Sequence, residues 1–427
     1  MSELKERIKG CLGDLLPLRY GKSLPAAVRD NTGSVPVYGS SGVVGNHSAA
    51  LTGGPAIIVG RKGNVGAVHY SAVPCWPIDT AYFAEAPIEH DPRYYLYLLD
   101  SLGLARLDKS TAIPGLSRDD YNAVEVTIHP PEQQAEVVAE IEKQFSRLDE
   151  AVANLQRVKA NLKRYKAAVL KAAVEGRLVE TEASIAQREG RSYETGEQLL
   201  QSTLVARQAQ WVGRGKYKTP EPPQVSDASL PEGWAWATLE QLHLQIADVD
   251  HKMPKAQDAG IPYISTKDFF GDEGIDFTKA KLISAKDYET LCSKVKPARG
   301  DLLLSRYGTV GEVREVSIDE PFQASYSVAI LKPVRGFVPI RFLIAALRSD
   351  VVQRQIKRDV RATAQPDLGL VHIRQFVVPV PPMAEQLRIL EELDRQLSIL
   401  RGIEAEVENN LLRAQKLRQS TLSKAFT

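Results

Sequence analysis

The stretch VEVTIHPPEQQ (124–134) returns further along the chain as FVVPVPPMAEQ (376–386). Just ahead of these stretches, TAIPGL (111–116) matches TAQPDL (363–368) at an offset of 252 residues. Internal repetition identifies the architecture of a chain before any local motif does. We therefore interpret the sequence as two copies of one plan, in which a globular segment is followed by a short strand, a proline pair and a long segment.

Each long segment after a proline pair has the periodicity of a helix. In the first copy, apolar residues recur at steps of four and three at Ile141, Phe145, Leu148, Val152, Leu155, Val158, Leu162, Tyr165 and Val169. The second copy repeats the pattern at Leu390, Leu393, Leu397, Leu400, Ile403, Val407 and Leu411. Each segment predicts a helix of about 45 residues, which is roughly 65 to 70 Å long at ~1.5 Å per residue.

A narrow apolar stripe needs a partner, and the repeat favours pairing between the two helices. Strand-like runs at 55–60, 123–128, 300–305 and 327–333, with short helices at 92–102 and 341–349, make each globular segment a mixed domain. The predicted fold class is α+β, with two mixed α/β domains at opposite ends of an antiparallel coiled coil and a pseudo-two-fold internal repeat. The alternative is two separate helices, each packed on its own domain.

These patterns also predict the limits of each part of the chain. The predicted parts are a first globular domain at 1–130, a first long helix at 131–179, a connector at 180–230, a second globular domain at 231–380 and a second long helix at 381–427. Within the connector, 196–211 has a helical pattern, whereas 213–234 is rich in Pro, Gly and Ser and predicts a weakly ordered linker.

The composition indicates a soluble globular protein of two or three domains, with 427 residues and a formal net charge of +1. No run of ~18 apolar residues predicts a membrane span, and the first residues lack the apolar core of a signal peptide, so we expect a cytoplasmic protein. The three cysteines, Cys11, Cys75 and Cys292, have no metal-ligand or disulfide spacing. We expect them to be reduced.

The glycine-rich stretch GRKGNVG (60–66) resembles a phosphate cradle, but strand-like residues flank it on both sides. A dinucleotide fingerprint instead opens a helix, so we predict a hairpin turn in which Gly63 or Gly66 takes positive φ. YGKS (20–23) has Leu16 where a P-loop requires glycine. No nucleophile elbow, metal-ligand spacing or Asn/Asp-Pro-Pro-aromatic methylation motif is present, so no catalytic residue and no metal ligand is predicted.

A second glycine-rich stretch, SRYGTVGEV (305–313), matches the first, and small polar and basic residues recur around both. Such residues on turns bind phosphates and read base edges, so both sets are candidate DNA contacts. The first set is Ser40, Ser41, Arg61, Lys62, Asn64, Lys109, Ser110 and Thr111. The second set is Thr266, Lys267, Ser305, Arg306, Tyr307, Thr309, Arg358, Arg361 and Thr363.

Together these motifs resemble the specificity subunits of type I restriction-modification systems. The resemblance covers essentially the whole chain and rests on the helix openings PPEQQ and PPMAEQ, each after PGL or PDL and a short strand. It also rests on VLKAAVEGRLV (169–179), its echo TLSKAF (421–426) and LPEGWAWATLEQL (230–242). PPEQQ is one residue shorter than PPMAEQ.

The resemblance implies that each globular segment is a target-recognition domain for one half of a bipartite, asymmetric DNA site. The helices would set the gap and dock two modification subunits, with contacts assigned to Pro130, Pro131, Gln134, Pro381, Pro382, Glu385 and Gln386. S-adenosylmethionine, ATP and Mg would belong to those subunits and to motor-nuclease restriction subunits, and this chain would be non-catalytic. A self-contained DNA methyltransferase or nuclease, and a coiled-coil scaffold that reads no DNA, are the alternatives.

Overall fold

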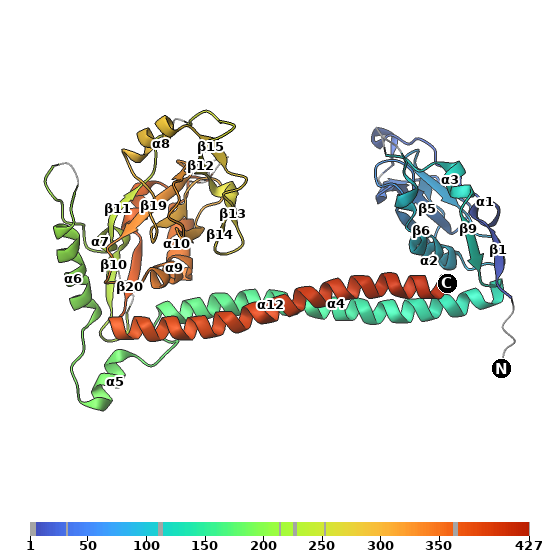
Figure 1. Cartoon of the computed structure of the whole chain (residues 1–427). Coiled ribbons are helices and arrows are strands. Elements are labelled where there is room, and N and C mark those ends of the chain that lie inside the picture. Colours follow the sequence, from blue (N-terminus) through green and yellow to red (C-terminus); the bar gives the residue numbers. More distant parts are fainter. Residues whose placement is uncertain are drawn as a thin grey trace. The chain divides into compact units, whose positions relative to one another are not determined.

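The computed structural model describes residues 6–30, 33–109, 114–212, 215–224, 229–251, 253–361 and 366–426 (Figure 1). The chain forms two compact units: unit 1 comprises Met1–Lys159 and Ala405–Thr427, and unit 2 comprises Ala160–Glu404. The helices α4 (Pro131–Val174) and α12 (Met383–Phe426) each contribute to both units. Each helix has 44 residues, which confirms the predicted length.

The globular part of unit 1 holds two small sheets and a strand pair. The four-stranded antiparallel sheet has the order β2 (Arg19–Tyr20), β8 (Ala81–Ala84), β5 (Ala56–Gly60), β6 (Val68–Ser71). The three-stranded sheet has the order β4 (Gly42–His47), β3 (Val35–Gly39), β7 (Trp76–Pro77), and β3 pairs with β7 in parallel. β1 (Ile8–Cys11) pairs with β9 (Glu125–Ile128). The helical elements are α1 (Leu12–Leu15), η1 (Ala26–Val28), α2 (Pro92–Leu102), η2 (Leu104–Leu107) and α3 (Arg118–Asn122).

The globular part of unit 2 repeats this topology strand for strand. Its four-stranded sheet has the order β11 (His243–Ala247), β19 (Val328–Pro333), β16 (Leu302–Ser305), β17 (Val313–Glu315). Its three-stranded sheet has the order β15 (Lys281–Ile283), β12 (Ile261–Ile264), β18 (Gln323–Ala324), again with one parallel pair. β10 (Ala235–Thr238) pairs with β20 (Val377–Val380). The matching order confirms the two copies inferred from the sequence.

The remaining elements of unit 2 are mostly helical. They are α7 (Leu239–Leu242), η3 (Thr266–Asp268), α8 (Ala285–Cys292), α9 (Ile340–Arg348), α10 (Asp350–Asp359) and α11 (Leu370–Gln375). A hairpin of β13 (Phe269–Phe270) and β14 (Gly274–Ile275) is an addition that unit 1 lacks within the part of the chain described here.

The connector contains two helices, α5 (Glu182–Glu189) and α6 (Gly196–Ala209). The pattern at 196–211 predicted α6, which begins with a capping box between Thr195 and Gln198. No sequence pattern had indicated α5. Described residues 215–224 and 229–234 contain no helix or strand, and the other residues of the predicted linker, 213–214 and 225–228, lie outside the described ranges.

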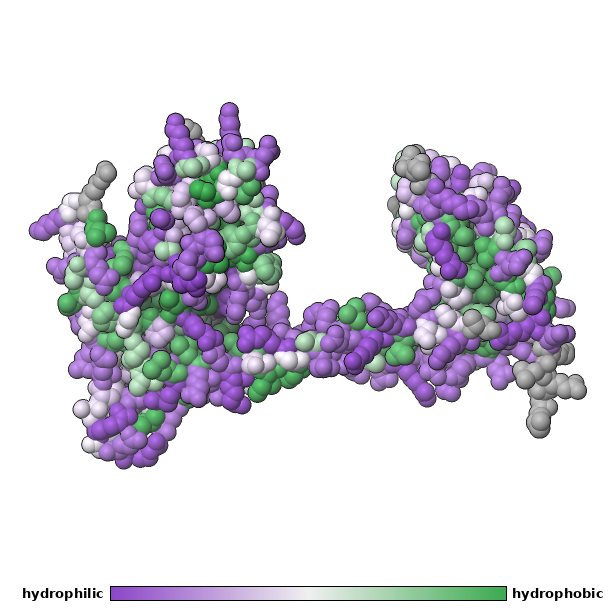
Figure 2. Space-filling model, in the orientation of Figure 1, coloured by the Kyte–Doolittle hydropathy of each residue, from purple (hydrophilic) through white to green (hydrophobic). Residues whose placement is uncertain are grey.

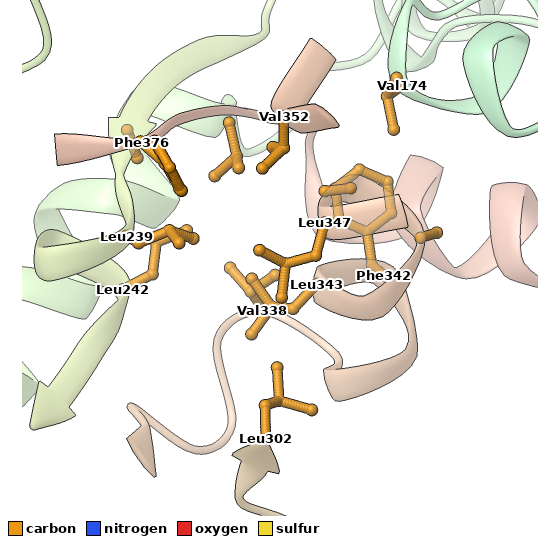
Figure 3. Close-up of a cluster of buried hydrophobic side chains, with 14 of the residues drawn as sticks. Val174, Leu239, Leu242, Leu302, Val338, Phe342, Leu343, Leu347, Val352 and Phe376 are labelled. Carbon is orange, nitrogen blue, oxygen red and sulfur yellow. The ribbon is translucent and has the colours of Figure 1, made fainter. Parts of the chain in front are cut away.

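The core of unit 2 joins the globular part to the two long helices. Phe342, Leu343 and Leu347 of α9 meet Leu302 of β16 and Phe376 (Figure 3). The same buried cluster includes residues from both long helices, namely Val169, Ala173, Val174, Ile389 and Leu393. Full burial of one such aromatic or aliphatic side chain contributes roughly 1.5–3 kcal/mol to folding. The start of α12 and the end of α4 are therefore integral parts of this core.

The two long helices pair in antiparallel directions within each unit. In unit 1, Arg418 forms an ion pair with Asp149 at 2.8 Å, and Lys159 forms one with Glu408 at 2.8 Å. In unit 2, the Tyr165 hydroxyl donates to Gln396 Oε1 at 3.3 Å. These contacts confirm the predicted pairing.

The buried seam differs in part from the predicted one. Leu393, Leu400, Val407 and Ala414 of α12 are buried at intervals of seven residues. Three residues predicted for the seam, Val158, Tyr165 and Ile403, lie at its side and are 39%, 52% and 41% exposed. Figure 2 accordingly shows a mainly hydrophilic helix surface with isolated hydrophobic residues. Within the described ranges, no helix is long and apolar enough to cross a membrane.

Candidate nucleic-acid interface

Residues 60–67 of unit 1 form the tight turn between β5 and β6. The backbone N–H of Gly60 donates to Ala67 O at 2.7 Å, and that of Gly66 donates to Gly60 O at 2.8 Å. Gly63 and Gly66 have φ of +80° and +74°, in the region that favours glycine. The prediction of a hairpin turn is confirmed, because the loop joins two antiparallel strands and opens no helix.

Two other segments hold this loop by backbone hydrogen bonds. The N–H groups of Arg61 and Lys62 donate to Thr80 O at 2.9 and 3.1 Å. The N–H of Leu116 donates to Arg61 O at 2.9 Å. Leu116 ends the repeated stretch TAIPGL, so two motifs that recur in the sequence are in direct contact within unit 1.

Unit 2 reproduces four of these five hydrogen bonds. Ser305 N–H donates to Glu312 O at 2.8 Å, and Gly311 N–H donates to Ser305 O at 2.9 Å. Arg306 N–H donates to Ser327 O at 2.9 Å, and its carbonyl accepts from Leu368 N–H at 2.8 Å. We call residues 60–67 and 305–312 the reading loops, and they occupy equivalent places in the two units.

A second turn lies beside the reading loop of unit 1. In unit 1 this turn is Ser40 and Ser41, between β3 and β4, and a Cβ added at Gly63 would lie 3.4 Å from Ser40 Oγ. Ser40 is buried and Ser41 is exposed. In unit 2 the equivalent residues are Thr266 and Lys267, because the parallel pairs Tyr38↔Pro77 and Ile264↔Ala324 fix the same register.

Arg61 lies among aromatic rings on the surface of unit 1. Its guanidinium carbon stands 5.0 Å from the ring centroid of Tyr20 and 5.7 Å from that of Tyr82, and Nη1 donates to Asp79 O at 3.2 Å. Arg118 also lies over Tyr20, at 5.2 Å. Cation–π contacts of this kind hold a guanidinium plane in a fixed orientation. The sequence pattern did not single out Tyr20, Tyr82 or Arg118; the charge and aromatic character of each were its only signals.

Arg306, the equivalent of Arg61, has a different environment. Its guanidinium is only 7% exposed and forms ion pairs of 3.0 Å with both Asp248 and Asp367. It also donates to the carbonyls of Leu368 and Tyr326 at 2.9 and 3.0 Å. Arg306 was predicted to contact DNA, but in this structure its side chain is buried and joins two segments of unit 2 through these ion pairs. Ser305, which bonds Glu312 N–H through its hydroxyl, is likewise buried.

Tyr307 is the aromatic residue that unit 2 presents on its reading loop. The ring of Tyr307 lies edge-on to that of Tyr326, with centroids 5.6 Å apart. The exposed His251 stacks on Tyr326, with ring centroids 4.4 Å apart. No spacing in the sequence would have identified His251 or Tyr326. Unit 1 therefore presents an arginine where unit 2 presents tyrosines and a histidine.

The remaining predicted contact residues differ in how exposed they are and in whether they form ion pairs. Lys62, Asn64, Lys267, Thr309 and Arg361 are exposed. Lys109 forms an ion pair of 2.7 Å with Asp120, and Arg358 forms one with Asp359. Ser110, Thr111 and Thr363 lie outside the described residues. Which of these side chains contact DNA stays a prediction.

The close packing of the reading loop makes Gly66 intolerant of a side chain. A Cβ at Gly66 would overlap the backbone of Leu104 and Ala105, and its φ is positive. We expect Gly66→Ala to cost at least about 2 kcal/mol of unfolding free energy, from strain and steric overlap together. Gly63→Ala is the matched control, because Gly63 also has positive φ but only an ordinary neighbour, and it should cost about 1 kcal/mol. Urea unfolding measures both, and equal losses would contradict the proposed close approach.

The residues assigned to partner contact lie at the starts of α4 and α12. Gln134 is buried, donates through Nε2 to His129 O at 3.0 Å and accepts from Asp91 N–H at 3.1 Å. Gln386 donates through Nε2 to Pro381 O at 2.7 Å. The two glutamines are 252 residues apart, so the shorter PPEQQ motif leaves both helix starts in phase.

The other residues of this set are also engaged within the chain. Glu385 is buried and accepts from Trp234 Nε1 at 3.0 Å and from Glu182 N–H at 2.8 Å. Burial raises the pKa of Glu385, against the lowering effect of these two hydrogen bonds. Three of the prolines, Pro130, Pro381 and Pro382, are buried, and Pro131 is half-buried. These side chains fasten each helix to its globular part, and a direct contact with a partner subunit stays a prediction.

Metal ligands and disulfides are not found within the described ranges. No group of three or more His, Cys, Asp or Glu side chains there is placed to hold a metal ion. Cys11, Cys75 and Cys292 are free thiols in the structure.

Comparison with known families gives a match in both copies of the repeat. The model of the family described as "Type I restriction modification DNA specificity domain" matches residues 6–164 and 231–409. Among curated proteins, the specificity subunit of the type I restriction enzyme EcoDI of Escherichia coli is 21% identical over 97% of this chain and 86% of its own length. The EcoBI specificity subunit of the same organism is 24% identical over 70% of this chain, and the match spans 56% of that protein.

One solved structure shows a similar fold. A chain from a structure concerned with complex assembly and conformational transition of the type I R-M system has a TM-score of 0.63 at 18% identity, covering 99% of this chain and 98% of its own. The S subunit of the M. genitalium type I restriction-modification system covers 100% of this chain and 97% of its own, with a TM-score of 0.38 at 16% identity.

Proposed function

This chain belongs to the family of type I restriction-modification DNA specificity proteins, and from that premise we propose that each unit reads one half of a bipartite DNA site. The family supports a role in DNA sequence specificity. The observation that carries the proposal is the pair of reading loops. Both are held by four equivalent backbone hydrogen bonds, so we infer that each unit offers the same kind of turn to DNA.

The two half-sites should differ because the side chains on the two loops differ. Unit 1 presents Arg61, an arginine held by aromatic rings, whereas Arg306 is buried and unit 2 presents Tyr307. Arginine pairs with O6 and N7 of guanine, the commonest specific contact in the major groove. We infer that the half-site read by unit 1 contains a guanine at the position facing Arg61.

The long helices are proposed to set the gap between the half-sites and to dock two modification subunits. A rod of this length, ~66 Å at ~1.5 Å per residue, equals about two turns of B-DNA. The chain itself is proposed to be non-catalytic. S-adenosylmethionine, and the ATP and Mg used for cleavage, would be held by modification subunits and motor-nuclease restriction subunits.

The proposal is tested by mapping methylated adenines in a methylation-free host that co-expresses this chain with its modification partners. The expected result is one asymmetric bipartite motif with a fixed gap. Arg61→Gln should relax or change one half only, because a lost bidentate contact costs about 1–3 kcal/mol of discrimination at a single base pair. A symmetric motif, methylation by the purified chain alone, or sequence-blind binding would each refute the proposal.

A further inference from the structure

A basic cavity of about 340 Å³ lies between the connector and the edge of the four-stranded sheet in unit 2. It is lined by Arg207 of α6, Lys216 and Lys218 of the following segment, His243 at the start of β11, and Arg374 of α11. Trp211 also lines it. Glu240 is the one acidic side chain in this lining, against four arginines and lysines.

Arg207 is a buried cation with neutral partners. Its side chain is almost fully buried; Nε donates to His243 O at 2.8 Å, Nη1 donates to the Tyr217 hydroxyl at 2.9 Å, and its guanidinium lies over the Tyr217 ring at 5.4 Å. Among the residues that the structure describes, no carboxylate is within ion-pair distance of Arg207. By contrast, the buried Arg306 pairs with two carboxylates and the buried Arg314 with one. Burying a charge without a counter-charge is unfavourable, which leaves this site in need of an anion.

His243 supplies a second, independent sign of a ligand. The residue is 1% exposed, and Nδ1 lies 2.6 Å from Leu239 O, so Nδ1 carries the proton and donates it to that carbonyl. Its other ring nitrogen, Nε2, is buried and has no hydrogen-bond partner. Buried polar atoms are nearly always satisfied, so an unsatisfied nitrogen on a residue that lines the cavity points to a missing group.

We propose that Arg207, Lys216, Lys218 and Arg374 form a phosphate-binding pocket, with His243 at its wall. Arginine and lysine are the side chains that bind phosphate oxygens, and Arg207 and Arg374 are held in place by hydrogen bonds to backbone carbonyls. The phosphate belongs either to the backbone of bound DNA or to a free anion such as inorganic phosphate or pyrophosphate. This inference does not depend on base reading by the reading loops.

Phosphate binding should leave a signature on His243. Burial lowers the pKa of this imidazole to about 4; the hydrogen bond to Leu239 opposes the shift and Arg207 adds to it. The other charged groups lining the cavity are Lys216, Lys218 and Arg374, which disfavour the imidazolium, and Glu240, which favours it. A bound phosphate adds negative charge, and it accepts the proton that Nε2 carries once the imidazole is protonated, so it should raise the pKa of His243.

The first test uses the full chain and titrates inorganic phosphate and pyrophosphate by calorimetry and by tryptophan fluorescence, since Trp211 lines the cavity. The variant is Lys216→Gln with Lys218→Gln, two exposed lysines whose loss should not unfold the protein. The matched control is Lys163→Gln with Arg401→Gln, which removes the same charge from exposed positions of unit 2 outside the cavity. A free-anion site predicts binding that weakens at least tenfold in the variant and stays unchanged in the control.

The second test uses a DNA duplex carrying the mapped site. A DNA-phosphate site predicts that Lys216→Gln with Lys218→Gln weakens binding to all sequences alike and reduces the slope of log affinity against log salt by up to about 2. Base preference in the first half-site, which Arg61 is proposed to set, should stay unchanged, so failure here is separable from failure of the proposed function. In either case, ¹³C-histidine spectra should show the His243 pKa rising when the phosphate source is present, with His243→Gln used to assign the signal.

The two tests distinguish the sources of the phosphate, and a loss in both also supports the pocket. Loss of anion binding identifies a free-anion site, and loss of sequence-independent DNA affinity identifies a backbone contact. Unchanged affinity for inorganic phosphate, pyrophosphate and DNA in the lysine variant overturns the proposal, as does an equal loss in the control. An unmoved His243 resonance at saturating phosphate and DNA also overturns it.

Discussion

Arg306→Met is expected to destabilise unit 2 by about 3 kcal/mol, because removing one partner of a buried ion pair leaves the other charge uncompensated. Arg306 forms ion pairs with Asp248 and Asp367 at 3.0 Å each, and it also donates hydrogen bonds to two backbone carbonyls. Asp248 keeps its contact with Lys294 at 3.3 Å, so the loss should not exceed this figure by much. Urea unfolding followed by circular dichroism measures the change.

Arg61→Met is the matched control, since Arg61 occupies the equivalent place in unit 1. It is partly exposed, and its contacts are aromatic rings and the carbonyl of Asp79. We expect its stability cost to stay under about 1 kcal/mol, since exposed cation–π contacts are worth about 0.5–1 kcal/mol. Its DNA affinity should fall, whereas that of folded Arg306→Met should not. Equal stability losses would show that the two arginines have the same structural role.

Deleting one heptad from each long helix is expected to shorten the gap in the DNA site while both half-sites stay the same. The deletions are residues 152–158 of α4 and 409–415 of α12, which face each other across the pair of helices in unit 1. Seven residues remove about 10 Å of helix, or about three base pairs at ~3.4 Å each. Removing a whole heptad from both helices preserves the apolar seam.

The gap is measured by methylation mapping with the modification partners present. Deleting 152–158 alone is the control, because it shifts one helix against the other and breaks contacts such as Arg418 with Asp149. We expect the single deletion to lose both stability and methylation. Altered half-sites in the double deletion would refute the spacer role of the helices.

Repetition made the fold predictable, because it survives as periodicity and as matching motifs. The seven-residue period predicted both long helices, and the strand-like runs predicted β5, β9, β16 and β19, whereas the shorter strands had no clear pattern. The residues that are buried between the two long helices were harder to predict, because the sequence does not show how far one helix is rotated about its axis relative to its partner. Val158, Tyr165 and Ile403 fit the seven-residue period, but their side chains are exposed beside the buried seam.

The candidate site was predictable in position and less so in exposure. The sequence showed that residues 60–66 and 305–311 form equivalent turns, and the structure confirms this. It could not show that Arg306 is buried, because its two carboxylates lie 58 and 61 residues away along the chain. Tyr20 was missed for the same reason: stacking on Arg61 depends on a contact between distant segments.

The strand pairs β1–β9 and β10–β20 bring the two ends of each globular part together. Each part thus enters and leaves the rest of the molecule at neighbouring points, beside the glutamine that starts its long helix. A part built in this way is an exchangeable cassette: cutting at its first and last strands removes a complete domain without dividing a sheet. The same scaffold can therefore acquire a new half-site by a single exchange of sequence.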